Sequence, residues 1–225
     1  MKRFIKRVTS KVDKANFEFE KKYTRSGWLA HHGIQRSGTN FLLVCLKRYG
    51  IRVINQHDPE RNQPGHKHFR WYHDKSLIPL EILHQYGNSL KVCNAQELNK
   101  ACNFPSETRH IVIYKERSSS LVSTLNWGLR VSWFRSKDQA ISSADRYLND
   151  IEEYYKFWSD LSETSPQLVQ LVNYERIVRD NAVLTDALCA LGYHVKQIDL
   201  SVDEVPMSLK ARKVAISYDD VARLF

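Results

Sequence analysis

The stretch from residue 28 to residue 46 decides the fold, and it reads Trp28-Leu29-Ala30-His31-His32-Gly33-Ile34-Gln35-Arg36-Ser37-Gly38-Thr39-Asn40-Phe41-Leu42-Leu43-Val44-Cys45-Leu46. A short apolar segment leads into a loop with glycines at 33 and 38, and apolar residues then recur at helical spacing. A loop of this kind between a strand and a helix lets successive backbone N–H groups surround a phosphate at the helix N-terminus. We therefore predict an anion-binding loop at residues 33–40; the alternative is a glycine turn that serves packing alone.

The residues after the second glycine argue against a nucleotide triphosphatase. Such an enzyme continues Gly-Lys-Ser/Thr, with the lysine on the β- and γ-phosphates and the hydroxyl on Mg²⁺. This chain continues Gly38-Thr39-Asn40, and its cation, Arg36, lies inside the loop. The loop therefore suits a single terminal anionic group that is bound without a metal.

A second anion site is expected farther along the chain. Residues 110–114 form an apolar run typical of a buried parallel strand, and Lys115 follows at its carboxyl end. Open α/β sheets bind ligands at that end of their strands. Ser123 lies in the helix expected at residues 118–127, so backbone donors, a cation and a hydroxyl come together there. An ordinary capped helix after a strand is the alternative.

The rest of the chain alternates strands with helices. We expect further strands at 51–54, 90–93 and 168–174, and further helices at 77–86, 95–101, 143–162 and 182–191. The polar stretch 56–75 is expected to be mostly loop. Such alternation predicts an α/β fold with a parallel sheet flanked by helices, in a single domain over residues 26–225.

Much of the positive charge belongs to the N-terminal segment. Of the net charge of +9, residues 1–25 carry nine basic and three acidic groups, or +6, which leaves +3 for the other 200 residues. Apolar residues at 4, 5, 8 and 12 predict a basic amphipathic helix. Either it contacts an anionic membrane surface or it packs on its own domain with a solvated basic side. The weak charge of the remainder argues against a nucleic-acid-binding face.

Hydropathy and cysteine usage indicate the compartment. No apolar run approaches the ~18–20 residues of a membrane span, so we expect a cytoplasmic protein, at most peripheral to a membrane. The four cysteines have no metal-ligand spacing and are too few for a disulfide scaffold, so we expect reduced, mostly buried thiols and no metal site.

Residues 35–42, Gln-Arg-Ser-Gly-Thr-Asn-Phe-Leu, resemble the 5′-phosphosulfate-binding loop of the sulfotransferases that use 3′-phosphoadenosine 5′-phosphosulfate, PAPS. Arg36 stands for the usual lysine and Phe41 for the usual tryptophan. Lys115 and Ser123, eight residues apart, resemble the family's 3′-phosphate-binding pair, and Lys is also found there in the bacterial carbohydrate-type branch. Asn173-Tyr174-Glu175-Arg176-Ile177 resembles the strand end whose tyrosine lies by the adenine.

The resemblance spans Gly33 to about Gly192 in family order, with two departures. Glu116-Arg117 replaces the more usual Asn-Pro, which adds an acid near an anion site. Residues 210–213, Lys-Ala-Arg-Lys, stand where the family has its late Arg-Lys-Gly clamp. The resemblance implies a P-loop-like sulfotransferase architecture and transfer of a sulfuryl group from PAPS to a hydroxyl.

On this resemblance, Arg36 neutralises the bridging oxygen as the 5′-phosphate leaves, and no metal takes part. The implied cofactor-binding residues are Arg36, Ser37, Gly38, Thr39, Asn40, Phe41, Lys115, Ser123 and Tyr174. Lys115 and Ser123 would bind the 3′-phosphate, while Phe41 and Tyr174 would flank the adenine.

The acceptor hydroxyl also needs a general base, and His68 is the predicted one. Gly65-His66-Lys67-His68-Phe69 resembles the Lys-His segment of many sulfotransferases, so Lys67 would stabilise the transferring group. His31, His32 and Glu97 are the alternative bases, and an ordinary polar loop is the alternative for the segment. The remaining histidines are interpreted as surface or substrate contacts (His66, His73) or as structural (His57, His84, His110, His194).

The expected acceptor is a carbohydrate or glycolipid hydroxyl. Trp127, Arg130 and Trp133 are placed by the sequence to line its cleft, whereas the aromatics of the helix at 143–162 are expected to pack a core. Two other functions stay open. One is a Mg-ATP-dependent kinase with a degenerate P-loop, and the other is a non-catalytic anion-binding scaffold.

Overall fold

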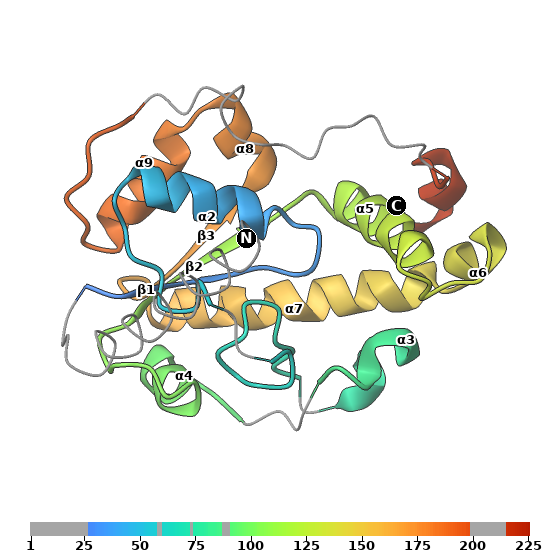
Figure 1. Cartoon of the computed structure of the whole chain (residues 1–225), viewed down its shortest axis with the longest axis horizontal. Coiled ribbons are helices and arrows are strands. Elements are labelled where there is room, and N and C mark those ends of the chain that lie inside the picture. The colour runs from blue at the N-terminus through green and yellow to red at the C-terminus, as the bar shows by residue number, and fades with distance from the viewer. Residues whose placement is uncertain (1–26, 58–59, 73, 87–90, 199–214) are drawn as a thin grey trace, which may run out of the picture.

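The computed structural model describes residues 27–57, 60–72, 74–86, 91–198 and 215–225, and Figure 1 shows helices on both sides of a small sheet. The predictions for residues 1–25, His73 and residues 210–213 lie outside these ranges. The strands are β1 (Leu29–His32), β2 (Arg109–Tyr114) and β3 (Val169–Asn173). The α-helices are α2 (Thr39–Arg48), α3 (Leu80–Leu83), α4 (Ala95–Ala101), α5 (Arg117–Arg130), α6 (Lys137–Ser142), α7 (Ala144–Thr164), α8 (Tyr174–Arg179) and α9 (Ala182–Ala190). Two 3₁₀ segments are η1 (Lys75–Leu77) and η3 (Asp219–Leu224).

The three strands are parallel and lie in the order β1-β2-β3, which confirms the predicted α/β class. His32 pairs with Val112 in one ladder, and Tyr114 pairs with Asn173 in the other. All three strands therefore end at the same edge of the sheet. The connections after them begin at Gly33, Lys115 and Tyr174.

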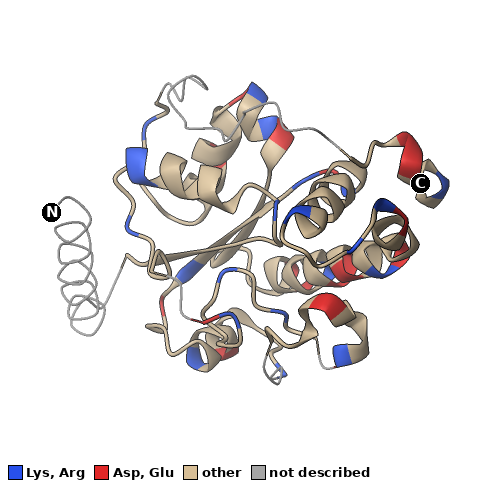
Figure 2. Ribbon diagram, turned by 45° about the vertical axis from the view of Figure 1, so that its right-hand side comes forward, with Lys and Arg blue, Asp and Glu red and all other residues tan. Residues whose placement is uncertain are grey.

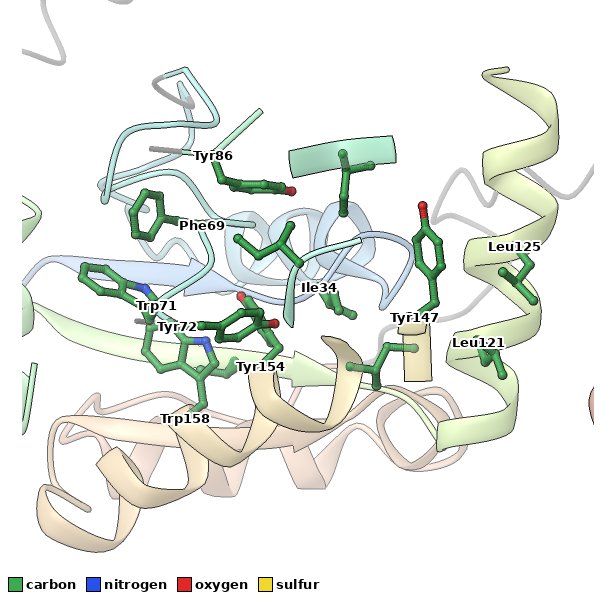
Figure 3. Packing of buried hydrophobic residues seen from close by; sticks show 14 of the residues in the cluster. Ile34, Phe69, Trp71, Tyr72, Tyr86, Leu121, Leu125, Tyr147, Tyr154 and Trp158 are labelled. Atoms are coloured by element: carbon green, nitrogen blue, oxygen red, sulfur yellow. The ribbon is translucent and has the colours of Figure 1, made fainter. Parts of the chain in front are cut away.

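The two faces of the sheet bury separate apolar clusters, because successive strand residues point to opposite sides. Ile111 and Ile113 pack with residues of α2 and α9, whereas Val112 packs with residues of α5 and α7. On the second face, Tyr154 and Trp158 of α7 meet the aromatic residues of segment 69–72 (Figure 3). The aromatic residues of α7 are thus mainly core, as expected from the sequence.

Two predicted strands are wrong. In residues 51–54 only Val53 makes a bridge, to Leu29, because the Asn55 side chain bonds both the N–H (3.0 Å) and the carbonyl (2.9 Å) of His31 in place of a continuing strand. Residues 91–93 are not a strand either. The N–H of Cys93 instead donates to the Glu97 carboxylate at the start of α4.

The helix predicted at 77–86 is reduced to α3, since Pro79 separates it from the 3₁₀ turn η1, which Asp74 caps. The short elements α6 and η3 were not expected. They pack near each other through an ion pair between Lys137 and Asp220 at 2.8 Å.

The described residues contain no helix long and apolar enough to cross a bilayer. Lys and Arg are spread over many of the described elements rather than gathered on one (Figure 2). All four cysteines are free, but Cys93 and Cys189 are exposed, so the expectation of mostly buried thiols holds only for Cys45 and Cys102.

Buried histidines form an unusual part of the interior. His32 Nε2 lies 3.1 Å from His110 Nδ1, and His110 Nε2 lies 2.8 Å from the side-chain oxygen of Asn99. His32 also packs on Trp158, with ring centroids 4.4 Å apart. Burial lowers the pKa of His31 and of His110 to about 3 and the pKa of His32 well below its ordinary value. These side chains are therefore neutral in the folded protein at neutral pH.

We predict that acid unfolds the protein through these histidines. The unfolded chain binds protons below a pH of about 6.5, whereas the folded histidines resist protonation down to about pH 3, so stability falls as the pH falls through this window. Urea unfolding measured between pH 7.5 and 5 should show this loss. A plot of the free energy of unfolding against pH should have a smaller slope near pH 5 in His31→Gln. The reduction is up to about 1.4 kcal/mol per pH unit, which is the linkage of one proton. His194→Gln, at an exposed position, is the matched control, and equal slopes for the two variants would contradict the prediction.

Candidate functional site

The candidate site is at the carboxyl edge of the sheet, where the predicted anion loop follows β1. Gly33 passes so close to β2 that a Cβ there would lie 2.7 Å from the carbonyl oxygen of Ile113. A Cβ on Gly38, which has φ +102°, would lie 2.7 Å from the ring of Tyr174. Glycine is thus required at both positions for the loop to lie against the neighbouring strand ends.

The loop presents backbone donors at the start of α2. Arg36 has φ 72°, so the loop turns back through a left-handed residue before Gly38 begins the helix. No side chain caps α2 at Gly38, so its first N–H groups have no side-chain acceptor there. The Ser37 hydroxyl is fully buried next to the Tyr155 hydroxyl, and the two groups form no well-oriented hydrogen bond. This is a donor set that an anion fits.

Three residues of the predicted nucleotide site lie together beside this loop. The rings of Phe41 and Tyr174 meet edge to face with centroids 5.3 Å apart, and the Lys115 Nζ lies 4.5 Å from the centroid of the Tyr174 ring. Burial lowers the pKa of Lys115; Arg36 lowers it further and Glu175 opposes the shift. A partly desolvated cation next to an aromatic ring can bind an anionic group strongly.

Glu116, the acidic residue that departs from the family pattern, is bonded to the end of β3. The Glu116 carboxylate accepts from the Asn173 side chain at 3.4 Å, and the Glu116 N–H donates to Glu175 at 3.4 Å. Asn173 also caps α8, since its oxygen accepts from the Arg176 N–H. Ser123 is half-buried, one and a half turns into α5, which begins two residues after Lys115.

The structure brings the predicted base segment to the anion loop. The Lys67 Nζ donates to the Asn40 side-chain oxygen at 3.3 Å, and the Gly33 N–H donates to the Lys67 carbonyl at 3.1 Å. His68 Nδ1 is bonded to the Gly33 carbonyl oxygen. A carbonyl only accepts, so Nδ1 carries the proton and Nε2 is left with the lone pair. Burial lowers the pKa of His68 well below its ordinary value, which keeps the ring neutral and leaves the Nε2 lone pair unprotonated.

The alternative bases lie elsewhere. His31 and His32 are buried within β1 and bonded to Asn55 and His110 respectively. The Glu97 carboxylate accepts at the start of its own helix, α4, which bonds the opposite end of β2 through Asn99. Of the four candidate bases, His68 is the one bonded to the anion loop, at the Gly33 carbonyl.

His66 is not at the surface, which corrects one of the two sequence interpretations of this residue. It is buried, and its Nδ1 accepts from the His68 N–H at 3.1 Å. Burial, followed by the charges of Lys67 and Arg61, lowers the pKa of His66 to about 3. A neutral His66 can thus fix the backbone of His68.

Sequence reasoning missed the buried ion pair beneath the site. Arg70 donates to both carboxylate oxygens of Asp150, from Nε and Nη2 at 2.7 Å each, and both side chains are 1% exposed. Its remaining donors bond the His68 carbonyl at 2.9 Å and the Gln35 side-chain oxygen at 2.8 Å. Burial alone would lower the pKa of Arg70, but the Asp150 carboxylate raises it well above the ordinary value.

Signals for this pair are present in the sequence. Arg70 interrupts the aromatic run Phe69-Arg70-Trp71-Tyr72, and Asp150 lies three residues after Tyr147 and four before Tyr154, on the buried stripe of α7. A charge at such positions requires a buried partner.

Two neighbouring tyrosines of α7 also support the site backbone. The Tyr154 hydroxyl donates to the Lys67 carbonyl at 3.1 Å. The Tyr155 hydroxyl donates to the Ile113 carbonyl at 3.1 Å and accepts from the Ile34 N–H at 3.4 Å. The helix thus fixes the anion loop, β2 and the base segment to one another.

We predict that Asp150→Asn lowers the free energy of unfolding by about 3–5 kcal/mol, because Arg70 is left buried without a counter-charge. Urea unfolding at pH 7.5 measures this loss. Glu152→Gln on the same helix is the matched control: it breaks the pair with Arg117, whose side chains are 70% and 40% exposed, and should cost about 0.5 kcal/mol or less. Equal losses for the two variants would contradict the importance of the buried pair.

Within the described ranges, no group of three or more His, Cys, Asp or Glu side chains is arranged to bind a metal ion. No protein-family model matches the chain, and no curated protein and no solved structure is significantly similar to it. The functional argument therefore rests on the residues and the geometry of the site.

Proposed function

We propose that this protein is a sulfotransferase that moves a sulfuryl group from PAPS to a hydroxyl acceptor. One observation carries the proposal: the anion loop, the Lys115–Tyr174 pair and His68, which is bonded to the Gly33 carbonyl, lie at one edge of the sheet. A P-loop-like sulfotransferase architecture would unite these parts, and the parallel sheet flanked by helices is compatible with it.

The residues present fit the donor nucleotide. The N–H groups of Ser37–Asn40 and the buried Ser37 hydroxyl would bind the 5′-phosphate, and Arg36 would balance its charge. Lys115 and Ser123 would bind the 3′-phosphate. Phe41 and Tyr174, already in contact, would accept the adenine between or against their rings.

When bound, PAPS supplies the activated sulfuryl group, and the chain supplies alignment and charge. His68 Nε2 would take the proton of the acceptor hydroxyl, an effect worth roughly 10²–10⁴-fold in rate. Lys67, fixed to Asn40, would neutralise charge on the transferring group. Arg36 would neutralise the charge that develops on the departing phosphate oxygen.

The proposed acceptor is a hydroxyl of a carbohydrate or glycolipid. A cytoplasmic location, with residues 1–25 on an anionic membrane surface, is part of the same proposal. The kinase alternative would need a lysine directly after Gly38 and a ligand for Mg²⁺, whereas the chain has Thr39 there.

We predict that 3′-phosphoadenosine 5′-phosphate binds without metal, at about micromolar Kd, and that Lys115→Ala weakens it by about tenfold or more. Isothermal titration calorimetry in the presence of EDTA measures the affinity of the wild type and of the variant. A parallel titration with ATP and Mg²⁺ tests the kinase alternative. Lys137→Ala, which removes a surface ion pair near the C-terminus, is the matched control and should leave binding unchanged. Binding of Mg-ATP alone would replace the proposal with the kinase; binding of neither nucleotide would favour the non-catalytic scaffold.

We predict further that His68→Gln lowers the rate of sulfuryl transfer roughly 10²–10⁴-fold with little change in nucleotide affinity. A mass-spectrometric transfer assay against a panel of hydroxyl compounds provides the readout. His194→Gln is the control, because His194 is exposed and lies outside both the base segment and the anion loop. A variant at His68 with normal turnover would refute its assignment as the base.

A further inference from the structure

A cavity of about 500 Å³ lies next to the candidate site. It is lined by residues 60–62, His84, Gln85, Trp127, Val131 and Trp133. Its volume is within the ~300–1,000 Å³ of small-molecule sites, and it is open to solvent along one side. None of its residues takes part in the proposed nucleotide site.

The two tryptophans of the cavity are fixed by the end of α5. Val131 and Trp133 donate their N–H groups to the carbonyls of Trp127 and Gly128, and Ser132 between them is left-handed with φ 62°. A Cβ on Gly128 would lie 2.4 Å from Phe134 and 3.0 Å from Trp133, so only glycine allows the chain to fold back here. The backbone that carries the two indoles is therefore fixed before any ligand arrives.

A second contact fixes Trp133 from behind. Its ring stacks on Tyr147 of α7, with centroids 6.2 Å apart and planes 18° from parallel. The Tyr147 hydroxyl in turn bonds Glu81 of α3 at 3.4 Å. Aromatic walls in a groove that is open to solvent suit the flat apolar faces of sugar rings. The hydroxyls of such rings can stay hydrated at the rim of the groove.

The charges around the groove favour an anion. The guanidinium carbons of Arg36 and Arg130 lie 5.1 Å and 4.0 Å from the centroid of the Trp127 ring. Arg61 lines the groove and bonds the Gln85 side chain, while Glu60 supplies the acid. Arg36 belongs to the anion loop, so Arg61 in the lining and Arg130 against its Trp127 wall are the two cations of the groove, beside the one carboxylate of Glu60. Guanidinium groups bind carboxylates and sulfates well.

Two sets of contacts connect the groove to the proposed reaction centre. Residues 60–62 lead through successive turns, from Gln63 to His66 to Phe69, into the segment that carries Lys67 and His68. On the other side, Trp127 connects the groove to Arg36 of the anion loop. The groove thus neighbours both the base segment and the anion loop.

We propose that this groove binds an acidic saccharide, a chain of sugar units that carries carboxylate or sulfate groups, and positions its adjoining unit for reaction. The inference rests on the proposed sulfotransferase function and specifies its acceptor. A small phenol would need a closed apolar slot, whereas this groove is open and partly polar. Its two indoles would contact the sugar faces, and Arg61 and Arg130 would bind the anionic substituents.

The test uses the full chain and a chondroitin tetrasaccharide, which alternates uronate with N-acetylhexosamine. Binding is followed by tryptophan fluorescence and calorimetry at 150 mM salt, without nucleotide. Chitotetraose, neutral and of equal length, and 4-nitrophenol are the competing probes. We expect the chondroitin tetrasaccharide to bind at least about fivefold more tightly than chitotetraose. Absence of chondroitin binding, or equal or tighter binding of either competing probe, overturns the proposal.

Substitutions that add a charge at Val131 test whether the saccharide binds in this groove. Val131 is 38% exposed and lines the groove, so Val131→Glu adds a repelling carboxylate without altering the core. It should weaken chondroitin binding by about threefold to tenfold, while Val131→Lys should not weaken it. Ala190→Glu on α9 makes the same charge change at an exposed position and should have no effect. Equal weakening by the two glutamate variants would mean that the saccharide binds elsewhere through general charge.

Titration of 3′-phosphoadenosine 5′-phosphate on the same sample separates the two proposals. Nucleotide binding without saccharide binding overturns the groove assignment alone. Saccharide binding at the groove without nucleotide binding overturns the sulfotransferase function and leaves a site for acidic saccharides.

Discussion

The buried pair of Arg70 and Asp150 is the interaction on which the site depends. Removing two charges from water is costly, and their attraction offsets that cost only when geometry is good and the other donors are satisfied. Here both conditions are met: the guanidinium bonds the carboxylate twice and also bonds the carbonyl of His68 and the side chain of Gln35. The rings of Tyr86 and Tyr154 lie over it at 5.1 Å and 5.3 Å. One residue thus connects α7, the anion loop and the base segment.

The second constraint is the parallel register, which brings residues far apart in sequence to one edge. Gly33, Lys115 and Tyr174 follow three strands that end together, so no long loop is needed to assemble the site. At Gly33 and Gly38 the loop lies directly against the neighbouring strand ends, with no room for a Cβ. Tyr155 completes it by bonding both the anion loop and β2. The site is accordingly built from strand ends and from a loop that is bonded to them, and such support favours the pre-organised anion binding proposed here.

The parts that could be predicted from sequence are those that local chemistry determines. The loop at residues 33–40, β2 followed by Lys115, and the long helix α7 all have strong local signals, because apolar periodicity and glycine spacing depend on neighbours in the chain. The parts that could not be predicted depend on distant partners. Residues 51–54 fail as a strand because Asn55 bonds His31, and residues 91–93 fail because Glu97 accepts from Cys93. Arg70 and His66 were missed because burial of a polar side chain depends on which distant residues pack against it.

The buried polar groups around His68 together fix its tautomer and its position. The Gly33 carbonyl fixes the proton on His68 Nδ1, and Gly33 is itself placed by its N–H bond to Lys67 and by its close approach to Ile113. The His68 N–H and carbonyl are bonded to His66 and Arg70, so both ends of the residue are constrained. A histidine restrained in this way has little freedom to rotate or to exchange its protonated nitrogen. Burial also keeps the ring neutral, so the Nε2 lone pair would be open to the proton of an acceptor in the proposed reaction, while the nearby charges of Lys67 and Arg70 disfavour a lasting imidazolium.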